Sequence, residues 1–267
     1  VSPSYAQEIQ GSEFGFGLDG LLRHRRDVLS GILNGIDTTA WDPATDKLIA
    51  RAYSDERLRD KHYNKHALRK RLGLAQAAKM PLLGMVCRLS PQKGVDLAIA
   101  AINRLLERPF QLAVLGSGSA ELACALHALA DSAPDRFAFV GEFDDSLAHL
   151  IEAGSDMFLM PSRFEPCGLN QMYSMRYGTI PIVRRTGGLA DTVTDATAQN
   201  LRDGLATGFV FDNADAADLT TALARALDTY PQRARWKTLQ LTGMRSDWSW
   251  ARSALGYRAL YREIVKG

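Results

Sequence analysis

PLLGMVCRLSPQKGVDLAIAAINRLL, residues 81–106, is the stretch that decides the fold. It opens with PLLGMVCRL, an apolar run typical of a buried strand, and the part that follows carries apolar residues at the spacing of one helix face. These helical positions are Leu97, Ala98, Ala101, Ile102 and Leu105. A strand that leads directly into an amphipathic helix is the repeating unit of an α/β fold.

The same alternation continues along the chain. Further strands are predicted at QLAVLG (111–116), FAFVG (137–141), DMFLMP (156–161), IPIVR (180–184) and GFVF (208–211). Helices are predicted between them at SAELACALHALA (119–130), DSLAHLIEAG (145–154), LNQMYSMRYG (169–178) and LADTVTDA (189–196). Strands that alternate with helices pair in parallel through right-handed crossovers. We therefore expect an α/β fold with a Rossmann-like, doubly wound parallel sheet of about six strands, covered by helices on both faces.

A helical C-terminal tail is expected after the sheet. Its helices are predicted at Ala214 to Leu227, from near Pro231, and from about Asp247 to Val265. Trp236, Trp248 and Trp250 lie in this tail. We expect these three rings to pack the terminal helices onto the rest of the protein.

The chain before residue 81 is less regular. Residues 1–30 predict helix fragments and loops, and GILNGID (31–37) predicts a short apolar strand ending in an Asn-Gly turn. For Asn34, a turn role and a role in a site are equally favoured. The stretch KHYNKHALRKRLGL (61–74) predicts a helix studded with basic residues. Such a helix could contact a polyanion or a glucan, but a solvated helix face is the favoured interpretation.

Composition restricts the classes of function. The 267 residues are 46% hydrophobic and 23% charged with a formal net charge of +2, which indicates a globular protein and gives no reason to expect nucleic acid or a membrane as partner. Cys87, Cys124 and Cys167 are odd in number and lack metal-ligand spacing, so we expect no disulfide framework, no metal site and a reducing, cytoplasmic location. VSPSYAQEIQ lacks the character of a secretion signal. Because the chain opens without methionine, we expect it to be a fragment.

Ligands of an open parallel sheet bind beyond the carboxyl ends of the strands, so the loops there are informative. After the first strand, RLSPQKG (88–94) places Arg88 and Lys93 on either side of a proline turn. A guanidinium and an ammonium together suit a diphosphate. Two exposed cations beside a loop are more often only solvated.

Three more loops carry glycines ahead of helices. Gly116 and Gly118 in GSGSAEL could let a nucleotide approach, although the same pattern serves as a tight turn. In RRTGGLADT, the backbone N–H groups of Gly187 and Gly188 are expected to be free donors, with a purely conformational role as the alternative. The helix after PSRFEPCGL should expose N–H groups suited to an anion, those of Gly168, Leu169 and Asn170.

PSRFEPCGL (161–169) also contains Glu165, the main candidate for a catalytic carboxylate. Glu165 stands beside a site that otherwise collects cations and N–H dipoles. It could accept a hydroxyl hydrogen bond, stabilise a developing positive carbon, or act as a base or nucleophile. Cys167 as a nucleophile would need a paired histidine, and none of the five histidines is an obvious partner. Cys167 is therefore expected to be a contact.

Several long motifs together resemble the bacterial glycogen synthase and plant starch synthase family. They are GILNGIDTTAWDPATD (31–46), RLSPQKGVDLAI (88–99) and PSRFEPCGLNQMYSMRYGTIPIVRRTGGLADTV (161–193), and the likeness runs from VSPSYA to SDWSW. The resemblance implies the donor-binding half of a glycosyltransferase-B fold, which transfers glucose from ADP-glucose to the non-reducing end of an α-1,4-glucan with retention. It implies no cofactor.

The resemblance also implies roles for single residues. Arg88 and Lys93 would hold the diphosphate, Gly168 to Asn170 would add backbone donors, and Glu165 would lie at the glucose. Asn34 and Cys167 would lie nearby, and Phe143 falls where the family stacks an aromatic ring on adenine, with a core phenylalanine as the alternative. Tyr173 stands where many other retaining relatives carry a second glutamate, which fits the glycogen and starch synthase branch.

A division of the chain follows from the same resemblance. Residues 1–30 would be an interdomain segment, 31–246 the donor-binding domain, and 247–267 a helix reaching toward an N-terminal domain that this chain lacks. Two other functions stay open at this point: another retaining nucleotide-sugar glycosyltransferase of the same fold, or a nucleotide-binding module only. By itself the half chain is expected to be inactive.

Overall fold

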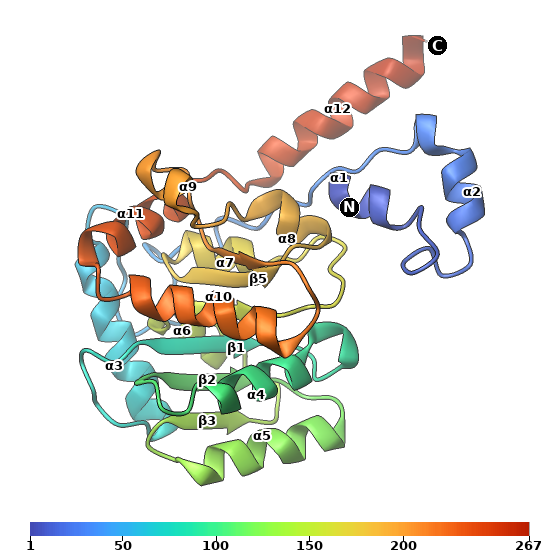
Figure 1. Cartoon of the computed structure of the whole chain (residues 1–267). Coiled ribbons are helices and arrows are strands. Elements are labelled where there is room, and N and C mark those ends of the chain that lie inside the picture. The colour runs from blue at the N-terminus through green and yellow to red at the C-terminus, as the bar shows by residue number, and fades with distance from the viewer. Residues whose placement is uncertain (267) are drawn as a thin grey trace.

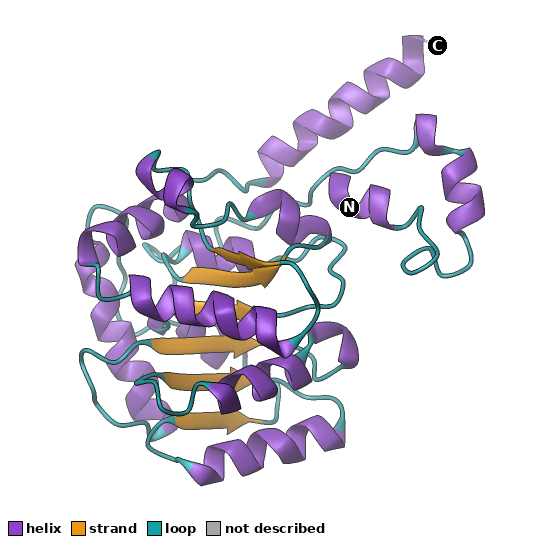
Figure 2. Ribbon diagram, viewed as in Figure 1, coloured by secondary structure: helices purple, strands orange, loops and turns teal. Residues whose placement is uncertain are grey.

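The structure, a computed structural model, describes residues 1–266. One parallel sheet forms its centre, with the strand order β3-β2-β1-β4-β5-β6 (Figures 1 and 2). The strands are β1 (Leu82–Val86), β2 (Gln111–Leu115), β3 (Phe137–Val140), β4 (Met157–Met160), β5 (Ile180–Arg184) and β6 (Phe209–Phe211). Every neighbouring pair is parallel, so the predicted doubly wound sheet is confirmed.

Helices cover both faces of this sheet. The face with α4, α5 and α10 is turned toward the viewer in Figure 1, and α3, α6, α7 and α8 lie behind. The helices are α1 (Pro3–Glu8), α2 (Asp19–His24), α3 (Lys61–Leu72), α4 (Val95–Arg104), α5 (Ala120–Ser132), α6 (Asp145–Gly154), α7 (Asn170–Arg176), α8 (Gly187–Thr192), α9 (Ala198–Arg202), α10 (Ala216–Thr229), α11 (Arg233–Met244) and α12 (Trp250–Lys266). Single 3-10 turns are η1 (Arg26–Val28), η2 (Leu58–Asp60) and η3 (Pro91–Lys93).

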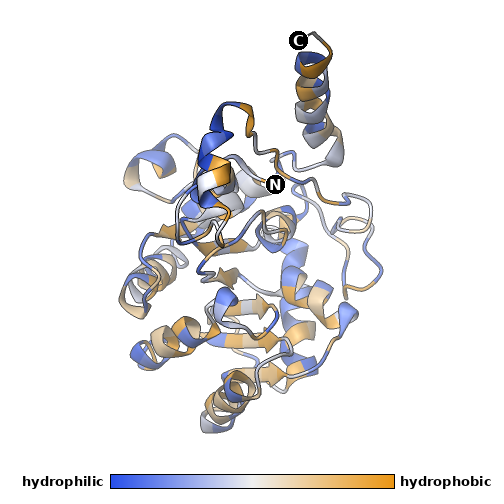
Figure 3. Ribbon diagram, turned by 90° about the vertical axis from the view of Figure 1, so that its right-hand side faces the viewer, coloured by the Kyte–Doolittle hydropathy of each residue, from blue (hydrophilic) through white to orange (hydrophobic). Residues whose placement is uncertain are grey.

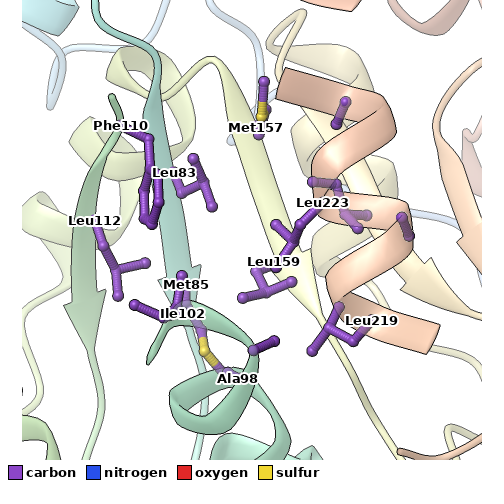
Figure 4. Packing of buried hydrophobic residues seen from close by; sticks show 14 of the residues in the cluster. Leu83, Met85, Ala98, Ile102, Phe110, Leu112, Met157, Leu159, Leu219 and Leu223 are labelled. Carbon is purple, nitrogen blue, oxygen red and sulfur yellow. The ribbon is translucent and has the colours of Figure 1, made fainter. Parts of the chain in front are cut away.

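The core divides into two layers because side chains of a strand alternate between the faces. In β4, Met157 and Leu159 point to the layer with α4 and α10, whereas Phe158 and Met160 belong to the opposite layer. Figure 4 shows the first layer, where Leu159 meets Leu219 and Leu223 of α10. Burial of both faces explains why the strands read as continuous apolar runs in the sequence.

Both ends of the chain extend beyond the sheet. Figure 1 shows α12 pointing away from it, and Figure 3, which looks onto the carboxyl ends of the strands, shows α12 clear of the sheet layers. Trp236 of α11 packs into the core as predicted, with 3% of its surface exposed, but Trp250 at the start of α12 is 50% exposed, so its predicted packing role is wrong. None of the described helices is both long enough and apolar enough to cross a membrane.

The short strand predicted at residues 31–37 is wrong. Only Ile36 makes a bridge, with Ser249, and its N–H donates to the carbonyl of Trp248 at 2.8 Å. Gly35 lies so close to this segment that an added Cβ would be 2.4 Å from the backbone nitrogen of Trp250. The segment therefore pairs with the entry to α12, a partner more than two hundred positions away that local sequence does not reveal.

The interpretation of the basic helix as a solvated face is also wrong for α3. Lys61, Lys65 and Arg69, spaced four residues apart, are all buried. Lys61 Nζ donates to the carbonyl of Ala153 at 2.8 Å, and Arg69 Nε donates to Gln111 Oε1 at 2.7 Å. The helix lies across the amino ends of the strands, where carbonyls and carboxylates need donors.

Candidate active site

The carboxyl ends of β1 and β4 and the start of α7 enclose a cavity of about 410 Å³. The structure brings six of the sequence-predicted residues together in its lining: Arg88, Lys93, Glu165, Gly168, Leu169 and Asn170. The edge is the one that open parallel sheets use for ligands.

Glu165 is the central carboxylate of this cavity. Its side chain is 8% exposed, and Lys93 Nζ lies 2.5 Å from its Oε2. Ser162 Oγ donates to the same oxygen at 3.1 Å. Sequence reasoning assigned Lys93 to a phosphate and Glu165 to a sugar, and the structure joins them directly. An ammonium has three donors, so Lys93 can hold this carboxylate and still offer hydrogen bonds to a second anion.

The loop that carries Glu165 is fixed from the neighbouring loop after β1. Arg163 binds the carboxylate of Asp96 in α4 through both terminal guanidinium nitrogens, at 2.8 and 2.6 Å. The backbone N–H of Arg163 donates to the carbonyl of Gln92 at 2.8 Å. Gly94 has φ +65°, and an added Cβ there would meet the carbonyl oxygen of Pro161 at 2.0 Å. A glycine at this position therefore allows the two loops to touch.

The turn before α7 presents backbone donors to the cavity. Gly168 has φ +69°, and within residues 1–266 the N–H groups of Gly168, Leu169 and Asn170 donate to no other group. Asn170 Nδ2 donates to the carbonyl of Val86 at 2.9 Å, which ties the start of α7 to the end of β1. These N–H groups can bind an anion beside Arg88, whose side chain is exposed.

The donors expected at Gly187 and Gly188 are not free, and this prediction is corrected. The Gly187 N–H donates to Glu8 Oε1 at 2.7 Å, and the Gly188 N–H donates to the carbonyl of Glu165 at 3.0 Å. Thr186 Oγ1 also donates to Glu8 Oε1, at 3.1 Å. The turn before α8 thus binds an internal carboxylate on one side and the backbone of Glu165 on the other.

Glu8 is the residue at this edge that sequence reasoning missed. It ends α1, and α1 is fixed to α8 by a second contact, in which Ser4 donates to Asp191 from its N–H at 3.0 Å and from its hydroxyl at 2.6 Å. Beyond α1, Phe14 and Phe16 pack on Phe164, the neighbour of Glu165. Nothing in the local sequence signals these contacts, because α1 and α8 are far apart along the chain.

Gly116 and Gly118 lie outside the cavity lining. An added Cβ would meet the carbonyl oxygen of Cys87 at 1.9 Å from Gly116, and that of Leu89 at 2.4 Å from Gly118. The Ser119 N–H donates to the Leu89 carbonyl at 2.8 Å. The geometry favours the tight-turn interpretation: these glycines let the loop after β2 pack on the loop that holds Arg88.

Burial favours the protonated form of the two cysteines near the site. Burial raises the pKa of Cys167, although a hydrogen bond from the backbone N–H of Asn34 opposes the shift. Burial also raises the pKa of Cys87, in the cavity wall, to about 12. Both shifts disfavour the thiolate, which is the nucleophilic form of a cysteine.

The hydrogen bond to Cys167 places Asn34 next to that residue. Neither residue lines the 410 Å³ cavity, and Asn34 lines a separate cavity together with Trp248, so their place near the glucose stays a prediction.

Phe143 is not a core residue. Its ring is 89% exposed, just before α6, and it lies outside the residues that line the 410 Å³ cavity. An exposed aromatic ring of this kind is free to stack on a planar ligand. The core alternative is thus excluded, and the adenine role stays a prediction.

Comparison with known proteins gives one family and a consistent set of relatives. Residues 69–239 match the family described as glycosyl transferases group 1. Over its whole length the chain is 54% identical to glycogen synthase 1 of Methylococcus capsulatus, and over 99% of its length it is 53% identical to a glycogen synthase of Cellvibrio japonicus. It covers 54% and 55% of those two proteins, so the chain spans about half the length of the curated relatives it matches.

Solved structures agree. The catalytic domain of starch synthase IV from Arabidopsis thaliana, bound to ADP and acarbose, superposes with a TM-score of 0.93 at 42% identity and covers the whole chain, which spans 55% of that structure. A sucrose-phosphate synthase from Thermosynechococcus elongatus matches 91% of this chain and 56% of its own with a TM-score of 0.60 at 22% identity, which shows a shared fold. The resemblance to glycogen and starch synthases indicated by the motifs is confirmed.

Proposed function

The chain belongs to the glycosyl transferases group 1 family, and from that premise we propose that it is the donor-binding half of a glycogen synthase. The whole protein would transfer glucose from ADP-glucose to the non-reducing end of an α-1,4-glucan with retention. One observation carries the proposal: the buried carboxylate of Glu165 is paired with Lys93 at the carboxyl edge of the sheet, in the cavity that Arg88 also lines. The similarity to glycogen synthases supports it.

Departure of ADP defines the first chemical requirement. The bond between glucose C1 and the phosphate oxygen breaks, and negative charge develops on that oxygen. Arg88, Lys93 and the N–H groups of Gly168 to Asn170 supply positive charge on one side of the cavity. Donors that are already oriented stabilise such charge without reorganising during the reaction.

Glu165 answers the second requirement, stabilisation of the positive charge on the glucose ring. Its carboxylate is held by Lys93 and Ser162, which fixes its position. We assign it electrostatic and hydrogen-bond support of an oxocarbenium-like sugar. The acceptor hydroxyl then bonds to C1 from the face that ADP leaves, and its proton passes to the departing phosphate oxygen. Configuration at C1 is retained.

The rest of the cleft is assigned to parts of the protein outside this chain. We propose that residues 31–246 form the donor-binding domain, and that residues 1–30 and 247–267 connect it to an N-terminal domain that contributes the acceptor surface. The exposed apolar residues of α12 support an interface there: Leu255, Tyr261, Ile264 and Val265 are between 56% and 85% exposed. By this proposal the half chain binds ADP weakly and makes no polymer.

Glucose transfer by the full-length protein tests the assignment. Lys93→Ala and Glu165→Ala should each remove most incorporation of glucose from ADP-glucose into glycogen, because the first removes a cation that stabilises the departing phosphate and the second removes the carboxylate that supports the sugar. Lys237→Ala is the matched control, since this lysine is exposed on α11 away from the cavity. Wild-type rates in both cavity variants would contradict the proposal.

Two further measurements separate the alternatives. Faster transfer from UDP-glucose than from ADP-glucose would assign the protein to another retaining nucleotide-sugar transferase. Calorimetry with ADP on residues 1–267 reports whether this half binds the nucleotide. Chain elongation by residues 1–267 alone would contradict the assignment of the acceptor surface to the other domain.

A further inference from the structure

Lys93 reaches the cavity from a single helical turn that has no apolar anchor of its own. The turn is η3 (Pro91–Lys93), and none of its three residues is buried. The N–H of Lys93 donates to the carbonyl of Ser90, and Gly94 leaves the turn in the left-handed conformation, at φ +65°. Burial of apolar surface is the main force that holds elements to a core. The position of Lys93 must therefore be fixed by other contacts.

Polar contacts to the neighbouring loop fix η3. Arg163 Nη1 donates to the carbonyl of Pro91 at 2.7 Å, and the backbone N–H of Arg163 donates to the carbonyl of Gln92 at 2.8 Å. In return, Gln92 Nε2 donates to the carbonyl of Phe164 at 3.2 Å. The turn is thus bound to the two residues that precede Glu165.

Asp96 holds the guanidinium of Arg163 in the orientation that makes these bonds. It lies in the first turn of α4, and its two oxygens accept from Nη1 and Nη2 of Arg163, at 2.8 and 2.6 Å. Paired hydrogen bonds of this kind fix the plane of a guanidinium as well as its position. Nη1 carries two N–H groups, so it can bind Asp96 and the carbonyl of Pro91 together.

The backbone of Arg163 is tied to the sheet on its other side. Arg184, the last residue of β5, donates from Nη1 to the carbonyl of Arg163. Arg184 Nε donates to the carbonyl of Asp212 at 3.0 Å, which holds this side chain in place. Arg163 therefore has a fixed support, and η3 is held against it.

The Asp96–Arg163 pair should matter more for geometry than for stability. Their side chains are 47% and 36% exposed, and exposed ion pairs contribute little to the stability of a fold. The same pair joins the two loops whose ends meet where Lys93 Nζ lies 2.5 Å from Glu165 Oε2. A displacement of about 1 Å between reacting groups can slow a reaction about a hundredfold.

We propose that Arg163 and Asp96 are positioning residues, which set the distance between Lys93 and Glu165 during glucose transfer. This inference rests on the proposed function. Neither side chain is among those that line the cavity, so both act through groups that do. Arg88 and the N–H groups at the start of α7 also contribute to donor binding, so loss of the pair should change kcat more than the KM for ADP-glucose.

A double-mutant cycle on the full-length protein tests the proposal. Asp96→Ala should lower kcat about tenfold, with less than about a threefold change in KM, because the guanidinium loses its orientation. Arg163→Ala should lower kcat at least as much, since it also removes the bond to η3. The double variant should be no slower than Arg163→Ala, because Asp96 acts only through Arg163. Asp96→Glu keeps a carboxylate and should recover part of the loss.

Asp228→Ala is the matched control. Asp228 of α10 pairs with Arg108 at 2.5 Å, in another exposed Arg–Asp pair, and neither residue lines the cavity. Wild-type kcat in both Asp96→Ala and Arg163→Ala would overturn the proposal, and so would effects that multiply in the double variant. An equal loss of kcat in Asp228→Ala would overturn it too, since the effect would then be general.

Hydrogen exchange at the Arg163 amide, which donates to the Gln92 carbonyl, reports on the contact between the loops without catalysis. Asp96→Ala should speed this exchange at least about fivefold, with the same urea midpoint as Asp228→Ala. Unchanged exchange would overturn the positioning role, and so would a midpoint lowered in Asp96→Ala alone, which indicates a merely structural pair. An inactive wild-type protein would contradict the proposed function, whereas the exchange rates would still decide whether Asp96 holds η3 through Arg163.

Discussion

Replacement of Glu8 tests how the N-terminal segment supports the candidate active site. Glu8→Ala removes the acceptor of the Gly187 N–H, at 2.7 Å, and of Thr186 Oγ1, at 3.1 Å. Hydrogen bonds to a charged group contribute about 1.5–3 kcal/mol each, and a carboxylate at a helix N-terminus adds about 0.3–1 kcal/mol. Because Glu8 is half-buried, we discount this sum for solvent screening and expect about 2 kcal/mol.

The effect should reach Glu165 through one turn of backbone. Gly188 donates to the carbonyl of Glu165 at 3.0 Å, and Gly187 lies so close that an added Cβ would be 2.0 Å from that carbonyl oxygen. When the turn loosens, the carboxylate is held less well in the transition state. We expect a kcat about tenfold lower with little change in the KM for ADP-glucose.

Three measurements on the full-length protein check this prediction. The urea midpoint of Glu8→Ala should fall by about 0.5–1 M, for a slope near 2–3 kcal/mol per M. Hydrogen exchange at the Gly187 amide should become faster, and glucan synthesis should slow. Glu8→Gln keeps a neutral acceptor and should recover about half of each effect.

Glu13→Ala is the matched control, because Glu13 is an exposed carboxylate of the same segment. A purely electrostatic effect of the segment would change both variants alike. The reasoning is refuted if Glu8→Ala matches Glu13→Ala in midpoint, in Gly187 exchange and in kcat.

The remaining predictions concern one buried acid, one buried ion pair and one exposed ring. Burial raises the pKa of Glu152 from 4.5 to about 8. Its carboxyl therefore contributes stability that is fully present below pH 4.5 and is lost as the pH rises toward 8. Glu152→Gln should flatten this decline in urea midpoints measured from about pH 5 to 8. Lys65→Met leaves the buried carboxylate of Asp156 without its cation and should lower the free energy of unfolding in urea by about 3–5 kcal/mol. The double variant with Asp156→Asn should recover most of this loss. No recovery would show that the broken ion pair is not the cause. Phe143→Ala should weaken ADP binding about five- to tenfold in calorimetry without changing the midpoint, because the ring is 89% exposed, and Phe143→Tyr should restore binding if stacking is the reason.

The sheet could be predicted because its signals are local. Runs such as MFLM in β4 are apolar at every position, and a strand buried on both faces requires this. The regular alternation with helices then implied parallel pairing, and parallel pairing brought the loops after the strands to one edge. Arg88, Lys93 and Glu165 meet in one cavity for that reason.

The errors share a physical cause, which is that charged and polar side chains take partners from distant segments. The five cations of α3 predict a solvent-exposed helix face. In the structure Lys61, Lys65 and Arg69 are buried, because they bind acceptors at the amino ends of the strands. Similarly, a double glycine before a helix signals free donors, but it cannot show that Glu8 already accepts from Gly187.

The sequence by itself determined the fold class, the edge of the sheet that carries the site, and the residue types gathered there, because apolar period and loop position are properties of neighbouring residues. Only the tertiary structure decided which donor meets which acceptor. Lys93 and Glu165 are 72 positions apart and Glu8 and Gly187 are 179 apart, and each pair is joined at hydrogen-bond distance. Such pairs form when the chain folds, because an unpaired polar group in a closed site costs more than the partner's conformational freedom.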